Sequence, residues 1–478
     1  MRTDIRESRG SSYESQFASN RKLTPGVDLR GYFPWVCPLQ VDHLPRDIAF
    51  QPASGRWRLS RVTTDGLLDV LRLLSIVLVL AVSPAALTAL GSDYQESQGT
   101  LLGKIHPATY IMLLTLLVLA CRAGPSRFLA STVSRHPGAV ALAWGVATLL
   151  AYDVLFIKAP LSSLVDTFVS PIAALIVFDR IGPGDGRKLS NLLHAIFLAN
   201  GLLALFEMAS GWRLTPLVVD GELLENETRS SALMGQPLAN AIMTGAYIII
   251  LARGGDRALP TWLRGALIAL QLAAMVPMGG RAASLATLGI LSVLALRQLA
   301  LLLMGKRFTR IAALAVVLIV PAAIAVMAIA YDQGFFDILI DRFNSDNRSA
   351  ETRVIMFQLF SHFPWFELLF GPDQQQLASL MWTEGTEYGI ESFPVALCLT
   401  YGILPASMLM LGLAIFAFDV IRSTRPGAAI SLAFFFVVAA TSLSLGGKTV
   451  GLASIVIMNM VLLRREAPIT STNAPQPG

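Results

Sequence analysis

The sequence predicts an all-α polytopic membrane protein with about 12 transmembrane helices and one large outer loop domain between spans 9 and 10. Three observations lead to this fold class. Hydrophobic residues make up 54% of the 478-residue chain, charged residues make up 14%, and the mean hydropathy is +0.60. A soluble globule of this length needs more polar surface. The apolar residues also recur in runs of roughly 16 to 24, long enough for a membrane helix, whereas strands of a membrane barrel are shorter and alternate.

Charged residues, Gly and Pro mark the boundaries of the candidate spans. The most informative boundary is Gly279-Gly280-Arg281. The apolar stretch from Trp262 to Met304 would form one helix of about 64 Å, about twice the hydrocarbon thickness, so we expect it to fold back at the glycine pair. The spans are predicted at 67–90, 105–121, 138–157, 161–178, 189–209, 237–252, 262–279, 282–303, 311–331, 390–421, 427–445 and 449–463.

The distribution of basic residues predicts the orientation, because Lys and Arg gather on the cytoplasmic side of membrane proteins. With the N-terminus inside, the twelve spans place all but nine of the 37 Lys and Arg residues on that side. Both termini are then cytoplasmic. We interpret residues 1–65 as a polar, largely disordered extension, 66–463 as the transmembrane domain, 332–389 as its outer lid loop, and 464–478 as a disordered tail.

The composition also excludes function classes. Cys37, Cys121 and Cys398 are too few and too scattered for a disulfide framework or a metal cluster, so no metal site is predicted. The pI near 9.2 is typical of many nucleic-acid-binding proteins. In a membrane protein, however, basic residues first report orientation, and we expect no nucleic-acid partner.

The nine basic residues on the outer side depart from the positive-inside tendency and therefore need an explanation. Arg229, Arg281 and Lys448 lie at or just before the outer mouths of spans, and Arg353 lies in a helix predicted within the lid loop. Converging guanidinium groups suit a phosphate or pyrophosphate, because each can make paired charge-assisted hydrogen bonds. The alternatives are that Arg281 reaches the lipid headgroups and that Arg229 pairs with Glu225 or Glu227. Arg342 and Arg348 can likewise be solvated partners of Asp341 and Asp346. The nine are Lys104, Lys158, Arg213, Arg229, Arg281, Arg342, Arg348, Arg353 and Lys448.

One carboxylate lies where the lid loop returns to the membrane. Glu391 begins the tenth span in the segment IESFPV and would face the same side as the arginines. A carboxylate there can take a proton from a hydroxyl nucleophile as a general base, or orient an acceptor sugar. The equal alternative is that it only interacts favourably with the positive end of the helix dipole.

Four segments, in this order, resemble the bacterial O-antigen ligase and polymerase family, which includes exopolysaccharide polymerases. They are RSSALMGQPLANAIMTGAYIIIL, GGRAASLATLGILSVL, SAETRVIMFQLFSHFPWFELLFG and GIESFPVALCLTYGILPASMLML. Their order and spacing match the family over about residues 185–463. The resemblance implies a membrane-embedded C-type glycosyltransferase of the bacterial inner membrane, with its active site facing the periplasm and the lid loop as a periplasmic domain.

The implied reaction transfers a glycan from undecaprenyl diphosphate to an acceptor sugar hydroxyl, with inversion and without a metal or other cofactor. The positions of Arg229 and Arg281 match arginines used on the diphosphate, and Arg353 matches the loop arginine. We predict Glu391, Arg281 and Arg353 as catalytic, and Arg229, Arg281, Arg353 and Lys448 as diphosphate-binding. Ligases of the family carry a histidine where this chain has Glu391-Ser392, which favours a polymerase over an O-antigen ligase that acts on lipid A core.

A flippase or transporter for lipid-linked oligosaccharides would also have about twelve spans. Transporters usually place polar residues near the midplane on interrupted helices. Asp153, Asp166 and Glu207 lie within or near predicted spans, and a mid-membrane position for them would favour transport. A third hypothesis is a non-catalytic member of a polysaccharide export assembly. The expected partners are the lipid-linked glycan, the acceptor glycan, the bilayer and other polysaccharide assembly proteins.

Overall fold

The computed structural model describes residues 61–94, 100, 102–157, 161–179, 181–215, 218–219, 222–223, 229–304, 331–332, 334, 337, 349–385, 390–442 and 445–465. Residues 311–330 of the predicted span 311–331, residues 1–60 of the predicted extension and the tail from residue 466 lie outside this range. The chain divides into two units, Met1–Arg58 and Leu59–Gly478, and every described element belongs to the second.

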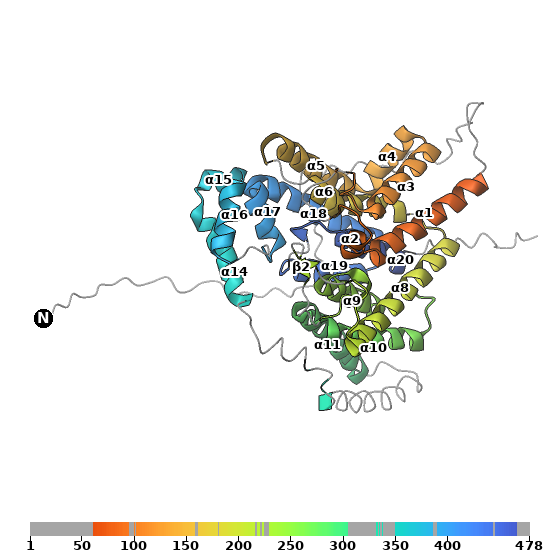
Figure 1. Ribbon diagram of the computed structural model, residues 1–478. Helices are drawn as coiled ribbons and strands as arrows, with labels where there is room; N and C mark the ends of the chain where they lie inside the picture. The colour runs from red at the N-terminus through yellow and green to blue at the C-terminus, as the bar shows by residue number, and fades with distance from the viewer. Residues whose placement is uncertain are drawn as a thin grey trace, which may run out of the picture. The chain divides into compact units, whose positions relative to one another are not determined.

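The described part of this unit is almost entirely helical (Figure 1). Short π-helical turns cover Asp153–Ile157 and Val165–Val169, 3₁₀ turns cover Ala232–Met234 and Leu359–His362, and β1 (Val218–Val219) pairs antiparallel with β2 (Glu222–Leu223). The helices are α1 (Arg61–Ala81), α2 (Pro84–Ala89), α3 (Pro107–Ala123), α4 (Pro125–Arg135), α5 (Pro137–Tyr152), α6 (Leu161–Leu164), α7 (Ser170–Phe178), α8 (Pro183–Ser210), α9 (Pro237–Ala252), α10 (Thr261–Met278), α11 (Arg281–Leu303), α14 (Ser349–Gln358), α15 (Trp365–Phe370), α16 (Gln374–Thr383), α17 (Phe393–Tyr401), α18 (Ile403–Ser423), α19 (Gly427–Ala439) and α20 (Gly451–Leu462).

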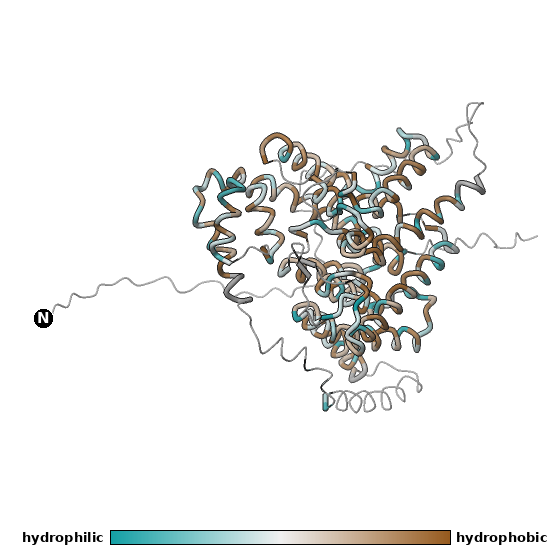
Figure 2. The backbone as a smooth tube through the Cα atoms, in the orientation of Figure 1, coloured by the Kyte–Doolittle hydropathy of each residue, from teal (hydrophilic) through white to brown (hydrophobic). Residues whose placement is uncertain are grey.

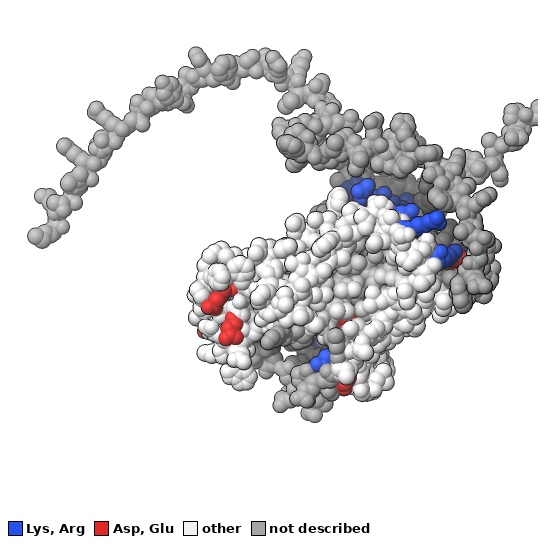
Figure 3. Space-filling model, turned by 90° about the horizontal axis from the view of Figure 1, so that it is seen from above, with Lys and Arg blue, Asp and Glu red and all other residues white. Residues whose placement is uncertain are grey.

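The helices show that the protein is a multi-span helical membrane protein. Among the described residues, 6 helical segments are long and apolar enough to cross a membrane, or up to 7 if the bent pair α3 and α4 is one span. Apolar residues run along these helices (Figure 2), and the face in Figure 3 is uncharged over most of its area, with basic side chains gathered along one edge. The six are Pro137–Ile157, Leu161–Phe178, Gly184–Ser210, Thr261–Met278, Arg281–Leu301 and Ile403–Ser423.

The predicted turn at Gly279-Gly280 is confirmed. Helix α10 ends at Met278, Gly279 takes a left-handed conformation with φ +62°, and α11 begins at Arg281. Glycine adopts this conformation without the steric cost that a side chain would add. Helix α9 also has the predicted bounds, at Pro237–Ala252.

Two predicted spans are broken in the structure. The segment 67–90 divides into α1 and α2, because Pro84 starts a new helix after the capping residue Ser83. The segment 390–421 divides into α17 and α18 at Gly402, whose φ is +90°. Hydropathy alone misses this break because both helices are apolar.

Short helices occupy the centre of the bundle. Side chains of α20 from Leu452 to Leu462 are all buried, and α9 is buried from Asn240 to Leu251, although these helices have 12 and 16 residues. By contrast, only 11% of the most apolar window of α11 is buried, so most of its surface is left to lipid. The length of a helix is therefore a poor guide to its depth in this fold.

Helices α5 and α18 pack closely because glycines face the neighbouring backbone. A Cβ atom on Gly138 would lie 2.6 Å from the Ile415 carbonyl oxygen, and one on Gly412 would lie 2.9 Å from the Ala141 carbonyl oxygen. Small residues let membrane helices approach in this way. This pair connects the bundle to α17 and to the lid-loop helices α14–α16, which share a separate small core that includes Met356, Leu359 and Leu377.

Candidate functional site

The C-termini of α8 and α10 and the N-termini of α9 and α11 meet at one end of the bundle, which we call the Arg281 end. The segment between Gly211 and Gln236 crosses this end. Its Ser230 N–H donates to the carbonyl of Pro277 over 2.8 Å. The opposite end of the bundle, where α20 finishes, is called the Arg464 end.

A buried carboxylate organises the crossing segment. Glu207, near the end of α8, is 4% exposed and accepts four hydrogen bonds. Its donors are the Leu214 N–H at 3.1 Å, the Ser230 hydroxyl at 2.6 Å, the Ser231 N–H at 3.1 Å and the Ala232 N–H at 3.0 Å. A buried carboxylate must be satisfied in this way, because desolvation of an isolated charge is costly. The segment is therefore held from both of its ends by one side chain.

This anchoring brings Arg229 beside the turn that carries Arg281. A Cβ atom on Gly279 would lie 3.0 Å from Cδ and 3.1 Å from Cγ of Arg229, so the stem of that arginine packs on the glycine. The backbone carbonyl of Arg229 accepts a hydrogen bond from Arg213 over 2.6 Å. Arg229 and Arg281 are both half-buried. The structure thus brings Arg229 to the glycine turn that directly precedes Arg281, although the two residues were predicted from separate motifs.

Two asparagines support the same end of the bundle, and sequence reasoning missed them. Asn200 on α8 donates to the Asn240 side chain on α9 over 2.8 Å and accepts from the Leu233 N–H over 3.2 Å. Asn240 in turn donates to the Ser231 carbonyl over 3.1 Å. Both asparagines are fully buried, and their signal in the sequence is a polar amide within an apolar helix.

Lys448 lies in a second polar cluster at the Arg281 end. Its ammonium group donates to the Tyr94 carbonyl over 2.5 Å and lies 3.5 Å from the centre of the Tyr94 ring. The Tyr94 hydroxyl donates to Asp166 over 3.0 Å, and Asp166 also accepts from the Thr109 hydroxyl and the His106 N–H. The clusters around Arg281 and Lys448 are adjacent. A Cβ atom on Gly235 would lie 2.3 Å from the hydroxyl oxygen of Ser83, and the carbonyl of Val82 pairs with Nε2 of the His106 ring.

The environment of Lys448 lowers the pKa of its ammonium group. Burial lowers the pKa of Lys448 to about 8, the Asp166 carboxylate acts in the opposite direction, and Lys104 lowers it further. The ammonium form therefore predominates at neutral pH but is lost under mildly alkaline conditions. A lysine in this state can donate hydrogen bonds to an anion near pH 7.

The lid-loop helices hold the other two predicted residues. Arg353 lies in α14, which begins at Ser349, and the position of its side chain lies outside the described atoms. Glu391 is half-buried between Ile390, which belongs to the lid-loop core, and Ser392, which precedes α17. The proximity of these two side chains to Arg281 stays a prediction. Lys158, Arg342 and Arg348 lie outside the described residues.

The lid-loop helices are docked on the bundle by a glycine contact. A Cβ atom on Gly402 would lie 2.4 Å from the backbone nitrogen of Gly371, so the break between α17 and α18 is in direct backbone contact with the end of α15. The Tyr152 hydroxyl at the end of α5 donates to the Phe370 carbonyl. The Gln374 side chain adds hydrogen bonds to the carbonyls of Leu399 and Thr400.

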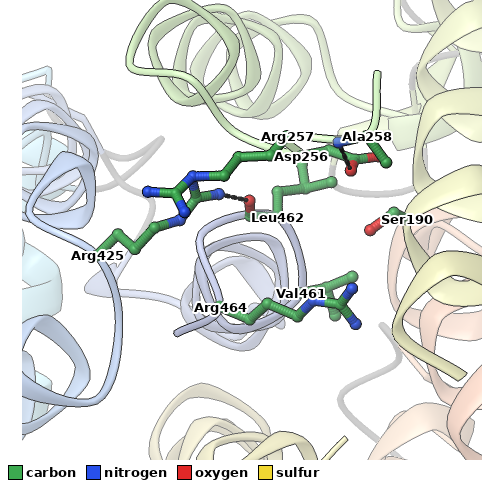
Figure 4. Close-up of a pocket in the computed structure, with 8 residues that line it drawn as sticks. All are labelled: Ser190, Asp256, Arg257, Ala258, Arg425, Val461, Leu462 and Arg464. Atoms are coloured by element: carbon green, nitrogen blue, oxygen red, sulfur yellow. Dashed lines mark hydrogen bonds between the residues drawn. The ribbon is translucent and has the colours of Figure 1, made fainter. Parts of the chain in front are cut away.

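Two described cavities lie away from the Arg281 end. One, of about 620 Å³, is lined by residues of α1, α3, α4 and α7, including Asp65, Arg72, Arg135 and Asp179. The other, of about 40 Å³, lies at the Arg464 end between Ser190, Asp256 and several arginines (Figure 4). Within the described part of the chain, no three His, Cys, Asp or Glu side chains converge as a metal site requires.

Comparison with known proteins adds no name to this site. No family model matches the chain, and no curated protein matches it. The helices and their hydropathy identify the chain as a multi-pass helical membrane protein.

Proposed function

We propose that the protein polymerises lipid-linked polysaccharide repeat units. It would transfer a glycan from undecaprenyl diphosphate to the hydroxyl of an acceptor sugar, in the synthesis of O-antigen or an exopolysaccharide. The observation that carries this proposal is the packing of Arg229 on Gly279. The aliphatic part of the Arg229 side chain lies beside the glycine turn from which Arg281 starts α11. Two arginines at one mouth of a membrane bundle suit a diphosphate on a lipid carrier.

The chemistry follows from the charge of the leaving group. As the anomeric C–O bond breaks, its electron pair passes to the diphosphate, whose negative charge grows. Fixed guanidinium donors then stabilise the transition state more than the ground state. The acceptor oxygen attacks the opposite face of the anomeric carbon, which inverts it, and its proton passes to Glu391. Arg353 would bring further positive charge with the lid loop, and Lys448 would bind a phosphate oxygen while it is protonated.

The proposal extends to topology. Twelve spans with both termini in the cytoplasm would place the Arg281 end and the lid loop in the periplasm of a bacterial inner membrane. The described helices supply 6 or 7 spans by length, and the shorter apolar helices α9, α19 and α20 would supply three more. Span 1 would correspond to α1, and the remaining span to residues 311–331.

The four motifs that resemble the O-antigen ligase and polymerase family support this class of reaction. The absence of a histidine at Glu391-Ser392 favours the polymerase over a ligase that transfers glycan to lipid A core. In a polymerase the acceptor is another lipid-linked repeat unit, so two carrier lipids must approach the same mouth.

The positions of the buried acids favour a transferase over a flippase. Of the three acids that bear on transport, Asp166 and Glu207 are buried and bind loops at the Arg281 end, namely the segment around His106 and the segment from Leu214 to Ala232. The third, Asp153, is buried at the start of the π-helical turn that follows α5. A transporter would use such acids at the midplane beside its substrate. Here the hydrogen bonds of Asp166 and Glu207 hold the walls of the mouth in place.

The experiment is reconstitution of the purified chain in liposomes with an undecaprenyl-diphosphate repeat unit. Longer glycan chains are expected from the wild type, and much shorter or no chains from Arg281→Ala and Arg229→Ala. Arg297→Ala, an exposed arginine near the other end of α11, is the matched control and keeps full activity. Full chain length from Arg281→Ala at normal protein level would overturn the assignment. Transfer only to lipid A core would indicate a ligase, and translocation without elongation a flippase.

A further inference from the structure

Three membrane-spanning helical segments begin or end beside the lid-loop helix α15. Residues 158–160 alone separate the segments Pro137–Ile157 and Leu161–Phe178, so the junction between these two spans lies at one membrane surface. A third segment, Ile403–Ser423, packs along the first, because Gly145 lies against Leu409 and Gly412 lies against Ala141. The start of the third span is therefore at the same surface as the end of the first.

The end of α15 is fixed against this membrane boundary by direct contacts. The Tyr152 hydroxyl at the end of α5 donates to the Phe370 carbonyl at the end of α15. A Cβ atom on Gly371 would lie 3.2 Å from Cδ1 of Ile157 and 3.2 Å from the backbone carbonyl carbon of Tyr401. Helix α15 therefore ends at the depth where one span finishes and another begins, although it belongs to the lid loop (Figure 1).

One face of α15 is aromatic and exposed. Trp365, Phe366 and Phe370 are 66%, 72% and 40% exposed, and helical spacing places them on the same side as Leu369. The rings of Phe366 and Phe370 contact each other, with 5.0 Å between their centroids. Leu368 points away from this face and joins the buried lid-loop core. A contiguous apolar surface of this kind is unfavourable in water and marks an interaction site.

The exposed surface of the neighbouring span is also apolar. Val154, Leu155 and Phe156, in the π-helical turn after α5, are 57%, 68% and 68% exposed. Only 28% of the most apolar window of this span is buried, so most of its surface is left to lipid. The Phe156 ring lies 5.1 Å from the ring of Tyr152, whose hydroxyl reaches α15. Exposed rings of the span and of α15 therefore lie near the same membrane boundary.

The chemistry of this surface fits the edge of a bilayer. Aromatic side chains gather at membrane interfaces, because their rings are apolar and still tolerate the polar headgroups. The exposed positions of α16 are different, since Gln375, Gln376 and Ser379 are polar as expected for a surface in water. We propose that the aromatic face of α15 inserts into the headgroup region of the bilayer and anchors the lid-loop helices to the membrane. The partner is the bilayer, because the aromatic face adjoins a span that lipid already covers.

Site-specific photocrosslinking of the full-length protein tests this docking. A photoreactive phenylalanine analogue replaces Phe366, which preserves the ring, and the protein is reconstituted in nanodiscs of phosphatidylethanolamine and phosphatidylglycerol. Mass spectrometry then identifies the adducts. Lipid adducts at Phe366 are expected to be about tenfold more frequent than at Ser379, because burial of one aromatic ring favours the docked arrangement by about that factor or more. Leu411, which is 64% exposed within α18, is the lipid-facing reference position for the same analogue.

The outcomes separate the bilayer from other partners. Lipid adducts at Phe366 near the frequency at Leu411, with few at Ser379, support the docking. Water adducts at Phe366 as frequent as at Ser379 overturn it, and so do adducts with a second copy of the chain. Lipid adducts that form only after undecaprenyl phosphate is added would overturn the bilayer as the partner. Trp365, on the same face, is labelled in a second sample and must agree, and because no substrate is needed, the result does not depend on the proposed polymerase activity.

Discussion

Replacement of Glu207 by Gln should release the segment that carries Arg229. Three of the four hydrogen bonds to Glu207 end on one carboxylate oxygen, and the fourth ends on the other. A glutamine keeps its oxygen toward the three donors and turns its amide toward the Leu214 N–H, which then loses its acceptor. The three remaining bonds also lose their charge assistance.

The magnitude follows from these bonds. A hydrogen bond to a charged group contributes about 1.5–3 kcal/mol and a neutral one about 0.5–1.5 kcal/mol, and an unsatisfied buried donor costs about 1–3 kcal/mol. Because such contributions are not additive, we expect local opening of the segment to become easier by about 3 kcal/mol. That corresponds to roughly a hundredfold faster amide exchange, because each 1.4 kcal/mol is tenfold.

Hydrogen exchange with mass spectrometry measures this effect in detergent or nanodiscs. Amides from Ser230 to Leu233 should exchange faster in Glu207→Gln, while amides of the buried helix α20 should stay unchanged as an internal control. The proposed polymerase activity of Glu207→Gln should also fall, because the released segment no longer holds Arg229 in place. Wild-type exchange rates between Ser230 and Leu233 would refute the reasoning, whatever the activity.

Three further predictions concern other positions of the fold. Gly279→Ala should lower the thermal midpoint and polymer length together, because φ is +62° and left-handed backbone costs a residue with a side chain about 1–2 kcal/mol; an unchanged midpoint would contradict this. His136 should make stability depend on pH. Burial alone would lower its pKa, but the carboxylates of Asp179 and Asp419 raise it from 6.5 to about 9. The ion pairs therefore add about 3 kcal/mol to the free energy of unfolding; this contribution is fully present below pH 6.5 and is lost as the pH rises to 9. Thermal unfolding across this range checks the sign, with His136→Gln as the variant that should lose the dependence. Gly402→Ala should undock the lid-loop helices at a cost of at least about 2 kcal/mol and expose them to proteolysis, and protection equal to that of the wild type would count against the contact.

The sequence alone predicted the features that depend on local pattern. Membrane class follows from hydropathy, and the reversal at Gly279-Gly280 follows from helix length against bilayer thickness, because both quantities can be read from one segment. Arg281 was therefore correctly placed at the start of a helix, and α9 was correctly bounded. The breaks at Pro84 and Gly402 were missed, because apolar residues continue across both and hydropathy does not report backbone direction.

Only the tertiary structure decided which side chains meet. Glu207 binds residues up to 25 positions away, and Arg464 lies on Gly186 from the far end of the chain. Such contacts depend on how helices pack and on where a glycine, which has no Cβ, leaves space. The periodicity of a single segment predicts neither. Arg229 became a neighbour of Gly279 for this reason, whereas its chemical type was evident from the sequence. Arg229 and Arg281 were thus foreseeable as charges, and packing across the bundle brought Arg229 to the glycine turn before Arg281, whereas the proximity of Arg353 and Glu391 stays a prediction.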